Sequence, residues 1–348
     1  MAPPLKRPPQ ETTENGATRQ VGVELEFIGL ESQPTAELVS RLYGGNIVKV
    51  DAHHYRVEET RFGDFEIELD TQYAHSKGIA QDQGAAAPSG TEPAAPPASD
   101  WGDRLEGQLR SAVGDVAKLW LPTEVSAPPI AWNELDRMEE LIEGLREAGC
   151  EGSDASLLYA FGLQLNPEVP SFSADSLRRH LQAYLVLSAW LRVEIGLDLT
   201  RRLVPFVAPF PRGYALMVLR EDYQPNLRGL ILDYLDHNPT RNRELDMLPL
   251  FAHLDLRRVT AMVEDERIRA RPTFHYRLPG TRLSEPGWGV SVEWNRWVEV
   301  ERLAADEERL MEMAVAYRRH FDAPFASTED WAARVRAWPG MGDGEADA

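Results

Sequence analysis

Two short segments of this chain carry paired glutamates at alternate positions, a spacing that suits metal chemistry on one face of a strand. The segment VGVELEF contains Glu24 and Glu26, and the segment DFEIELD contains Glu66 and Glu68, each between apolar residues. Side chains alternate between the two faces of a strand, so each segment has one apolar and one carboxylate face. Carboxylates suit Mg²⁺, which usually brings substrate phosphates with it. The alternative is a half-buried sheet with a solvated acidic face.

Two further segments alternate in the same way. In LPTEVSAPPI, Glu124 lies in a short strand that two prolines end, because proline lacks an amide donor. Taken alone, Glu124 is typical of a surface residue. In YAFGLQLNPEVP, Gln164 and Asn166 share a polar face with a glycine. This face is either a ligand surface that the backbone approaches closely or an ordinary sheet face.

Arginines gather in two later segments. The sequence NPTRNRELD carries Arg241 and Arg243, whose planar guanidinium groups suit carboxylates and phosphates. The alternative is the first turn of a helix capped by Thr240, where two cations would oppose the helix dipole. In RPTFHYRLPG, His275 and Arg277 share a face opposite two aromatic residues. A single histidine in a strand is more often structural than catalytic.

The elements that must position these residues are helices and strands without regular alternation, which favours an α+β fold with a mainly antiparallel sheet. Apolar spacing predicts helices over 103–119, 134–148, 175–195 and 302–319, with Asn133 and Ser173 as N-caps and Gly149 as a C-terminal stop. The predicted strands are 20–28, 46–50, 54–58, 64–70, 123–126, 159–166, 213–219 and 272–278.

Composition divides the chain into one large domain with polar ends. We expect a disordered N-terminal tail over 1–18, a single catalytic domain over 19–335 and a C-terminal tail over 336–348. An Ala/Pro-rich insertion, QDQGAAAPSGTEPAAPPASD, occupies about 81–100.

Charge and cysteine content exclude several classes of protein. The 348 residues include 37 Lys and Arg against 56 Asp and Glu, a net charge of −19. This argues against binding to nucleic acid or to an anionic membrane. The one cysteine, Cys150, excludes an internal disulfide and a multi-cysteine metal site. No apolar run approaches the ~20 residues that span a bilayer, and the first residues lack a signal-peptide core. We expect the protein to be cytoplasmic.

The ordered set of these segments resembles the putative amidoligase family, whose relatives include glutamine synthetase and glutamate–cysteine ligase. The resemblance runs from about Val21 to about Tyr317 and includes the helix that ends LREAGCEG. It implies a curved antiparallel sheet of the glutamine-synthetase-like type. Helices pack on the convex face of that sheet, and ATP and divalent metal bind on the concave face.

The resemblance also assigns residues to roles. Glu24, Glu26 and Glu124 take the places of metal ligands, and Glu66 and Glu68 extend the acidic face toward ATP or substrate. Two departures concern charged ligands: Gln164 and Asn166 stand where relatives have a His-x-His pair, and His275 stands where they have an acidic residue before the arginine, here Arg277.

The resulting hypothesis is an ATP- and Mg²⁺-dependent carboxylate–amine ligase that works through an acyl phosphate. Its substrates would be a small-molecule or peptide carboxylate and an amine. Catalytic charge would come from Arg277, with Arg241 or Arg243. The alternatives are a phosphotransferase on the same fold and a non-catalytic nucleotide- or peptide-binding relative. Relatives often assemble, so a homo-oligomer is an open expectation.

Overall fold

An open antiparallel sheet organises the structure, and the predicted α+β class is confirmed. The computed structural model describes residues 2–69, 122–153, 162–196 and 207–338. Within them, nine strands form one sheet in the order β2-β3-β4-β5-β1-β7-β9-β8, and β6 also pairs with β1. The strands are β1 (Gln20–Phe27), β2 (Asn46–Lys49), β3 (His54–Thr60), β4 (Gly63–Leu69), β5 (Thr123–Ser126), β6 (Ile130–Ala131), β7 (Leu163–Pro167), β8 (Leu245–Asp246) and β9 (His275–Tyr276).

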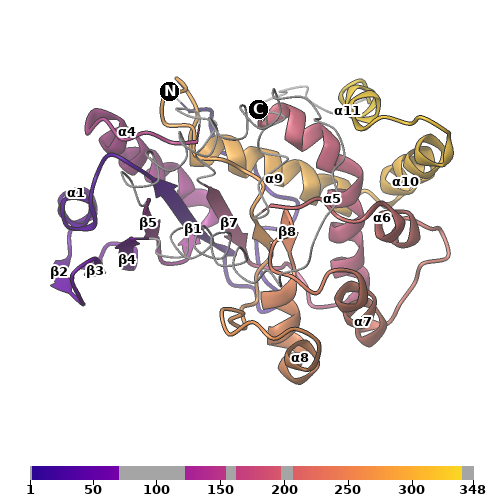
Figure 1. Ribbon diagram of the computed structural model, residues 1–348, viewed down its shortest axis with the longest axis horizontal. Helices are drawn as coiled ribbons and strands as arrows, with labels where there is room; N and C mark the ends of the chain where they lie inside the picture. The colour runs from indigo at the N-terminus through magenta and orange to yellow at the C-terminus, as the bar shows by residue number, and fades with distance from the viewer. Residues whose placement is uncertain (1, 70–121, 154–161, 197–206, 339–348) are drawn as a thin grey trace, which may run out of the picture.

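Helices gather around this sheet (Figure 1). They are α1 (Ser32–Tyr43), the 3-10 helix η1 (Trp132–Met138), α4 (Glu139–Glu147), α5 (Ala174–Glu194), α6 (Arg212–Val218), α7 (Leu227–His237), α8 (Leu248–Met262), α9 (Val290–Ala305), α10 (Glu307–Asp322) and α11 (Thr328–Arg336). None of the described helices is long and apolar enough to cross a membrane.

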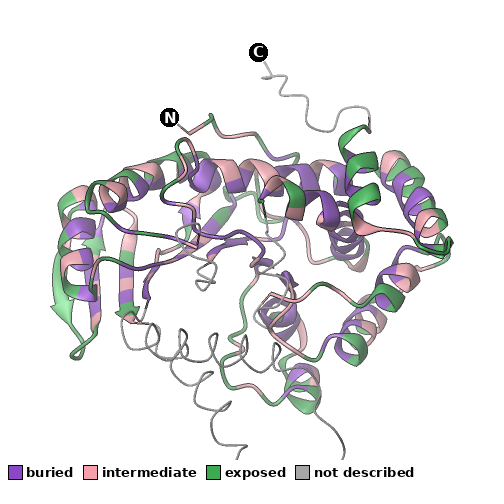
Figure 2. Cartoon of the chain, turned by 45° about the horizontal axis from the view of Figure 1, so that its top comes forward, coloured by how far each residue is buried: buried purple, intermediate pink, exposed green. Residues whose placement is uncertain are grey.

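The apolar face of the sheet packs against these helices because alternate residues of the central strands are apolar. All four apolar side chains of β1 are buried, while Glu24 and Glu26 between them are only partly covered. At one end, Tyr43 of α1 stacks on Phe65 of β4 with ring centroids 5.4 Å apart. At the other end, the ring centroids of Trp297 of α9 and Phe274 lie 5.4 Å apart. Figure 2 shows buried residues following the sheet and the inner sides of the helices, whereas β2 is exposed at the edge.

Three predicted strands differ from the structure. The segment predicted as a strand over 213–219 is helix α6, and its buried Tyr214, Ala215 and Val218 follow helical spacing. A short apolar run fits either element, and here its neighbours are helices rather than a strand partner. The strand predicted over 272–278 is confined to β9, two residues long. Of the strand predicted over 159–166, residues 159–161 lie outside the described part, and β7 begins at Leu163 after an isolated bridge at Gly162.

The helix predicted over 302–319 is two helices that meet at Asp306. This residue leaves the helical region with φ −98° and ψ 88°, and its side chain accepts a hydrogen bond from the Arg309 amide. Aspartate is a preferred N-cap because its oxygen satisfies an amide that the first turn leaves unpaired. The continuous apolar spacing concealed this break.

Helix ends agree with prediction at two positions and differ at a third. The Ser173 side chain accepts a hydrogen bond from the Ser176 amide and caps α5. Gly149 follows α4 with φ +76°, the left-handed conformation that favours glycine. The prediction that Asn133 caps a helix over 134–148 is wrong, because the segment begins as η1 at Trp132 with no side-chain cap.

The N-terminal segment, predicted as a disordered tail, lies against α9. The Lys6 ammonium contacts Glu299 at 2.6 Å, and the Trp294 indole donates to the Lys6 carbonyl at 3.0 Å. Arg19 is buried and makes two hydrogen bonds to Glu301, at 2.6 and 2.8 Å. A buried guanidinium requires such a carboxylate partner. The insertion at about 81–100, the predicted helix 103–119 and residues 339–348 lie outside the described residues.

We predict that Gly45→Ala destabilises the edge of the sheet strongly. Gly45 has φ +91°, and a Cβ there would lie 2.5 Å from the Glu58 carbonyl oxygen and 3.1 Å from the Thr60 amide nitrogen. A left-handed alanine costs about 1–2 kcal/mol by itself, and the backbone overlap adds to this cost. The control is Gly149→Ala, because Gly149 also has a positive φ but open space around it. Equal losses of unfolding free energy in the two variants would contradict the packing argument.

Candidate active site

The predicted carboxylates share one face of the sheet, with β5 between the two acidic strands. Glu26 of β1 lies directly opposite Glu124 of β5, and Glu124 lies opposite Glu68 of β4. One step along, Ser126 lies between Glu24 and Glu66. The period of two puts all these side chains on the face opposite the helix-covered core. The two glutamate segments therefore do converge, as their alternation predicted.

Glu26 and Glu124 form the centre of this acidic group. Both are partly buried. The Gly162 amide donates to Glu26 Oε2 at 2.9 Å, and the Ser126 hydroxyl donates to Glu124 Oε1 at 3.2 Å. Two carboxylates on directly opposite strand positions repel each other unless a cation or donors balance them. This pair is the part of the sheet best suited to a divalent ion.

Glu66 and Glu68 have different surroundings from that pair. The Glu66 carboxylate accepts from Arg56 Nε at 2.6 Å and from His54 Nε2 at 2.7 Å. These partners on β3 occupy both of its oxygens. Glu68 is exposed on the same strand. Glu66 therefore anchors β3 to β4, and Glu68 lies at the rim of the acidic group.

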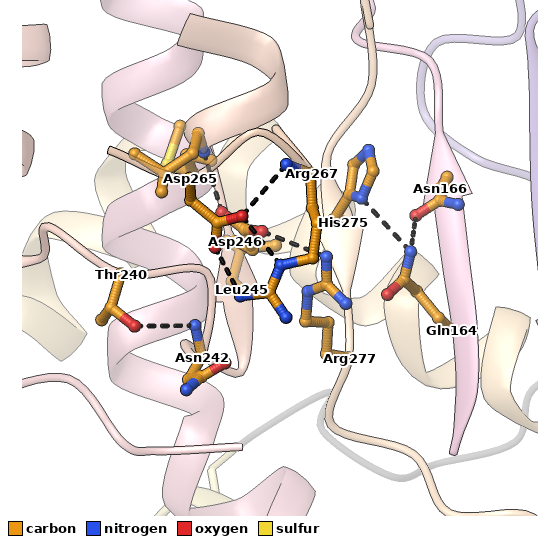
Figure 3. Close-up of polar contacts among 12 residues, drawn as sticks. Gln164, Asn166, Thr240, Asn242, Leu245, Asp246, Asp265, Arg267, His275 and Arg277 are labelled. Atoms are coloured by element: carbon orange, nitrogen blue, oxygen red, sulfur yellow. Dashed lines mark hydrogen bonds and ion pairs between the residues drawn. The ribbon is translucent and has the colours of Figure 1, made fainter. Parts of the chain in front are cut away.

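Glu24 begins a hydrogen-bonded chain that crosses three strands. Asn166 Nδ2 donates to Glu24 Oε1 at 2.8 Å, and Gln164 Nε2 donates to Asn166 Oδ1 at 2.8 Å. Gln164 Nε2 also lies 3.2 Å from Nδ1 of His275 on β9 (Figure 3). Gln164, Asn166 and His275 are buried. The structure thus links all four predicted residues in one network.

Arg277 lies beside this network and is held by Asp246. Arg277 Nη2 donates to Asp246 Oδ2 at 3.1 Å, and the other oxygen of Asp246 accepts from the Leu248 amide at 2.9 Å (Figure 3). Asp246 is fully buried. Burial raises the pKa of this carboxyl group, and the charge of Arg277 opposes that increase. Asp246 therefore fixes Arg277 and also accepts from the amide of Leu248, the first residue of α8.

The other two predicted arginines differ in their contacts. Arg241 is partly buried, and its Nε has no hydrogen-bond partner among the described residues. Burial and the nearby charge of Arg277 lower the pKa of the Arg241 guanidinium. Arg243 Nε also has no partner among the described residues, but Arg243 Nη1 donates to the Pro209 carbonyl at 2.7 Å. Arg241 thus extends the positive charge around Arg277, whereas Arg243 ties two loops together.

His275 is buried and lies in a field of positive charge. Burial, followed by the charges of Arg277, Arg271 and Arg241, lowers its pKa well below the ordinary value. The imidazole is therefore neutral at pH 7. Its Nε2 has no hydrogen-bond partner among the described residues.

The acidic end provides donors for a metal ion without a complete cage. No group of three or more His, Cys, Asp or Glu side chains in the described ranges could hold a metal ion. Mg²⁺ usually binds through only one or two carboxylates together with waters and substrate phosphates. The pair Glu26 and Glu124 fits that smaller requirement.

Three residues of the site were not predicted: Asp246, Ser126 and the backbone amide of Gly162. Asp246 ends the segment NPTRNRELD, and its carboxylate was a signal, but nothing in the sequence indicates that β8 pairs with β9. Arg277 bonds to Asp246 and not to Glu66 or Glu68, which lie across the sheet on β4. Thr240 caps no helix; it accepts from the Asn242 amide in a loop, at 3.2 Å.

Cys150 plays no part in this site. It is buried in the hydrophobic core. Burial raises the pKa of its thiol to about 11, so the thiolate is scarce at neutral pH. Cys150 is thus a buried core residue in its thiol form.

The chain belongs to the family described as "putative amidoligase enzyme", which its sequence matches over residues 17–299. The match includes every site residue discussed above and confirms the resemblance. The family name indicates an amide-bond ligase. No curated protein and no solved structure matches the chain.

We predict that acid destabilises the fold partly through His275. Its folded-state pKa lies below the unfolded value of 6.5. Its contribution to the free energy of unfolding is therefore complete above pH 6.5 and is lost as the pH falls. The expected slope is at most about 1.4 kcal/mol per pH unit for each such histidine. His275→Gln should flatten the slope between pH 6.5 and 5 in urea titrations. Exposed His53→Gln is the control, and an unchanged slope for His275→Gln would contradict the assignment.

Proposed function

We propose that this protein is an ATP- and Mg²⁺-dependent carboxylate–amine ligase that forms an amide or isopeptide bond. A substrate carboxylate attacks the γ-phosphate of ATP to give an acyl phosphate, and an amine then displaces phosphate. The observation that carries the proposal is the division of charge along one sheet face. The facing carboxylates Glu26 and Glu124 lie toward one end, and Arg277 lies toward the other, with Arg241 of the loop before β8 near it. On this proposal the sheet is of the curved, glutamine-synthetase-like type.

The acidic end suits the metal requirement of such a reaction. Mg²⁺, when bound, neutralises the phosphate charge and orients the nucleotide. Glu26 and Glu124 would hold it, with Glu24 beside them. The Gly162 amide fixes the Glu26 carboxylate, and the Ser126 hydroxyl fixes that of Glu124. Such supporting hydrogen bonds keep ligand carboxylates oriented.

The basic end suits the phosphoryl group. Charge spreads over its three oxygens in the transition state, so the protein contributes mainly positioning and positive charge. Asp246 holds one Nη of Arg277, while Arg277 Nε has no partner among the described residues. When only some N–H groups of a guanidinium are bonded within the protein, these bonds fix its orientation, and the remaining N–H groups can donate to a ligand. Arg241 adds charge beside it.

We predict that Glu26→Gln or Glu124→Gln lowers turnover by about 100-fold or more, because each removes one of two facing metal donors. The assay measures ADP release with Mg²⁺ across a panel of acids and amines, together with thermal melting. Glu58→Gln is the control, since Glu58 lies on β3, away from the facing pair. Wild-type turnover in either variant would contradict the metal role.

The same assay separates the alternatives. A ligase releases ADP in quantity only when acid and amine are both present. A phosphotransferase accumulates a phosphorylated product without an amine. Nucleotide binding without turnover across the panel would identify a non-catalytic relative.

We predict that Arg277→Lys lowers the single-turnover rate by about tenfold or more, with a smaller effect on ATP binding. Lysine keeps the charge but loses the planar fork. Arg243→Lys is the comparison, because Arg243 bonds to a loop carbonyl and should affect melting more than rate. If Arg277→Lys lowers only the melting temperature, Arg277 is a structural partner of Asp246.

A further inference from the structure

We propose that the network from Glu24 to His275 fixes one tautomer of His275, so that its Nε2–H binds an oxyanion of a substrate phosphoryl or carboxylate group. Gln164 and Asn166 are then positioning residues. This inference rests on the proposed function, which makes the oxyanion part of a substrate, but its test requires no turnover.

The orientation of the network follows from Glu24. A carboxylate only accepts hydrogen bonds, so the Asn166 atom 2.8 Å from Glu24 Oε1 must be the Nδ2 donor. The oxygen of Asn166 consequently faces Gln164. That oxygen also accepts, so the Gln164 atom 2.8 Å away must be Nε2.

The same reasoning fixes His275. The Gln164 side-chain NH₂ group lies 3.2 Å from His275 Nδ1. An amide NH₂ group can donate hydrogen bonds but cannot accept them. His275 Nδ1 must therefore accept. In a neutral imidazole, the proton is then on Nε2. A single carboxylate thus determines, through two amides, which nitrogen of His275 carries hydrogen. Figure 3 shows the two amides and the imidazole.

The Nε2–H of His275 is the one end of this chain without a partner. Only 6% of the residue is exposed, and Nε2 is among the buried atoms without a hydrogen bond in the described part of the chain. An unsatisfied buried donor costs about 1–3 kcal/mol. An acceptor oxygen from a ligand would remove that cost.

The surroundings select an anion as that acceptor. The charges that act on His275 are those of Arg277, Arg271 and Arg241. Asp246 lies opposite His275 in the β8–β9 pair, but its oxygens accept from Arg277 and the Leu248 amide. Arg277 Nε and Arg241 Nε are likewise buried donors without partners in the described residues. Three unsatisfied donors and excess positive charge suit an oxyanion and disfavour a cation.

The first test is the tautomer itself, measured by long-range ¹H–¹⁵N correlation spectra of the histidine rings at pH 7.5. His180 is an internal reference, because its Nδ1 donates to the Ser176 carbonyl at 2.8 Å and it therefore has the opposite tautomer. We expect Nε2–H for His275, assigned with His275→Gln. Gln164→Glu should shift His275 to Nδ1–H or to the imidazolium, since a carboxylate there must accept. Nδ1–H or averaged tautomers in the wild type would overturn the proposal.

The second test is anion binding, measured by calorimetry with inorganic phosphate and with glutarate, without nucleotide. His275→Phe keeps a ring but removes the donor, and we expect affinity to fall by about tenfold, the value of one lost hydrogen bond. His275→Gln restores an N–H near the Nε2 position and should stay within about threefold of wild type by the same scale. Melting curves confirm that the variants fold.

The two probes distinguish the source of the oxyanion. Tighter binding of phosphate assigns the site to the phosphoryl group, and tighter binding of glutarate assigns it to the substrate carboxylate. Wild-type affinity in His275→Phe, or no binding of either anion to the wild type, would overturn the proposal. Failure of the ligase assay alone would leave the tautomer and anion results intact and would remove only the catalytic interpretation.

Discussion

The pairing of β1 on both sides, with β5 and with β7, is the constraint on which the rest of the structure depends. A strand that is paired on both edges exposes neither edge, so the residues on its two faces determine which side is buried and which side is polar. One face carries four apolar side chains and is buried by helices. The other must then bring Glu24 and Glu26 against the polar residues of both neighbours. A slip of one residue would place these charges in the core.

On the polar face, the carboxylates have different partners. Glu66 is balanced by Arg56 and His54 at the β3 side. Glu24 is bound by a neutral amide, and Glu124 faces both Glu26 of β1 and the exposed Glu68 of β4. Toward β8 and β9 the excess is positive, with Asp246 holding Arg277 in place. An acidic end and a basic end on one surface suit a substrate that carries both phosphate and metal.

Neutral amides join the two ends. Gln164 and Asn166 stand where the family resemblance implies imidazoles. Here they carry no charge, and they fix the donor–acceptor direction of the hydrogen bonds. Each amide has one donor end and one acceptor end, so the acceptor-only carboxylate of Glu24 sets the orientation of both. His275, in place of an acidic residue, ends the chain as a donor among arginines. The two departures from the family pattern are therefore parts of one arrangement.

The sequence by itself determined the longer strands with their polar and apolar faces, the α+β class and the family, because alternation of side chains is local. It also identified Glu24, Glu26, Glu124, Gln164, Asn166, His275 and Arg277 as candidate residues of the site. It did not reveal that β8 would bring Asp246 to Arg277, or that Arg243 would bond to a loop. Those contacts depend on which distant strands pair, and strands of two residues have almost no local signal. Likewise, helix α6 and the break at Asp306 were decided by tertiary neighbours, since a short apolar run packs equally well as helix or strand.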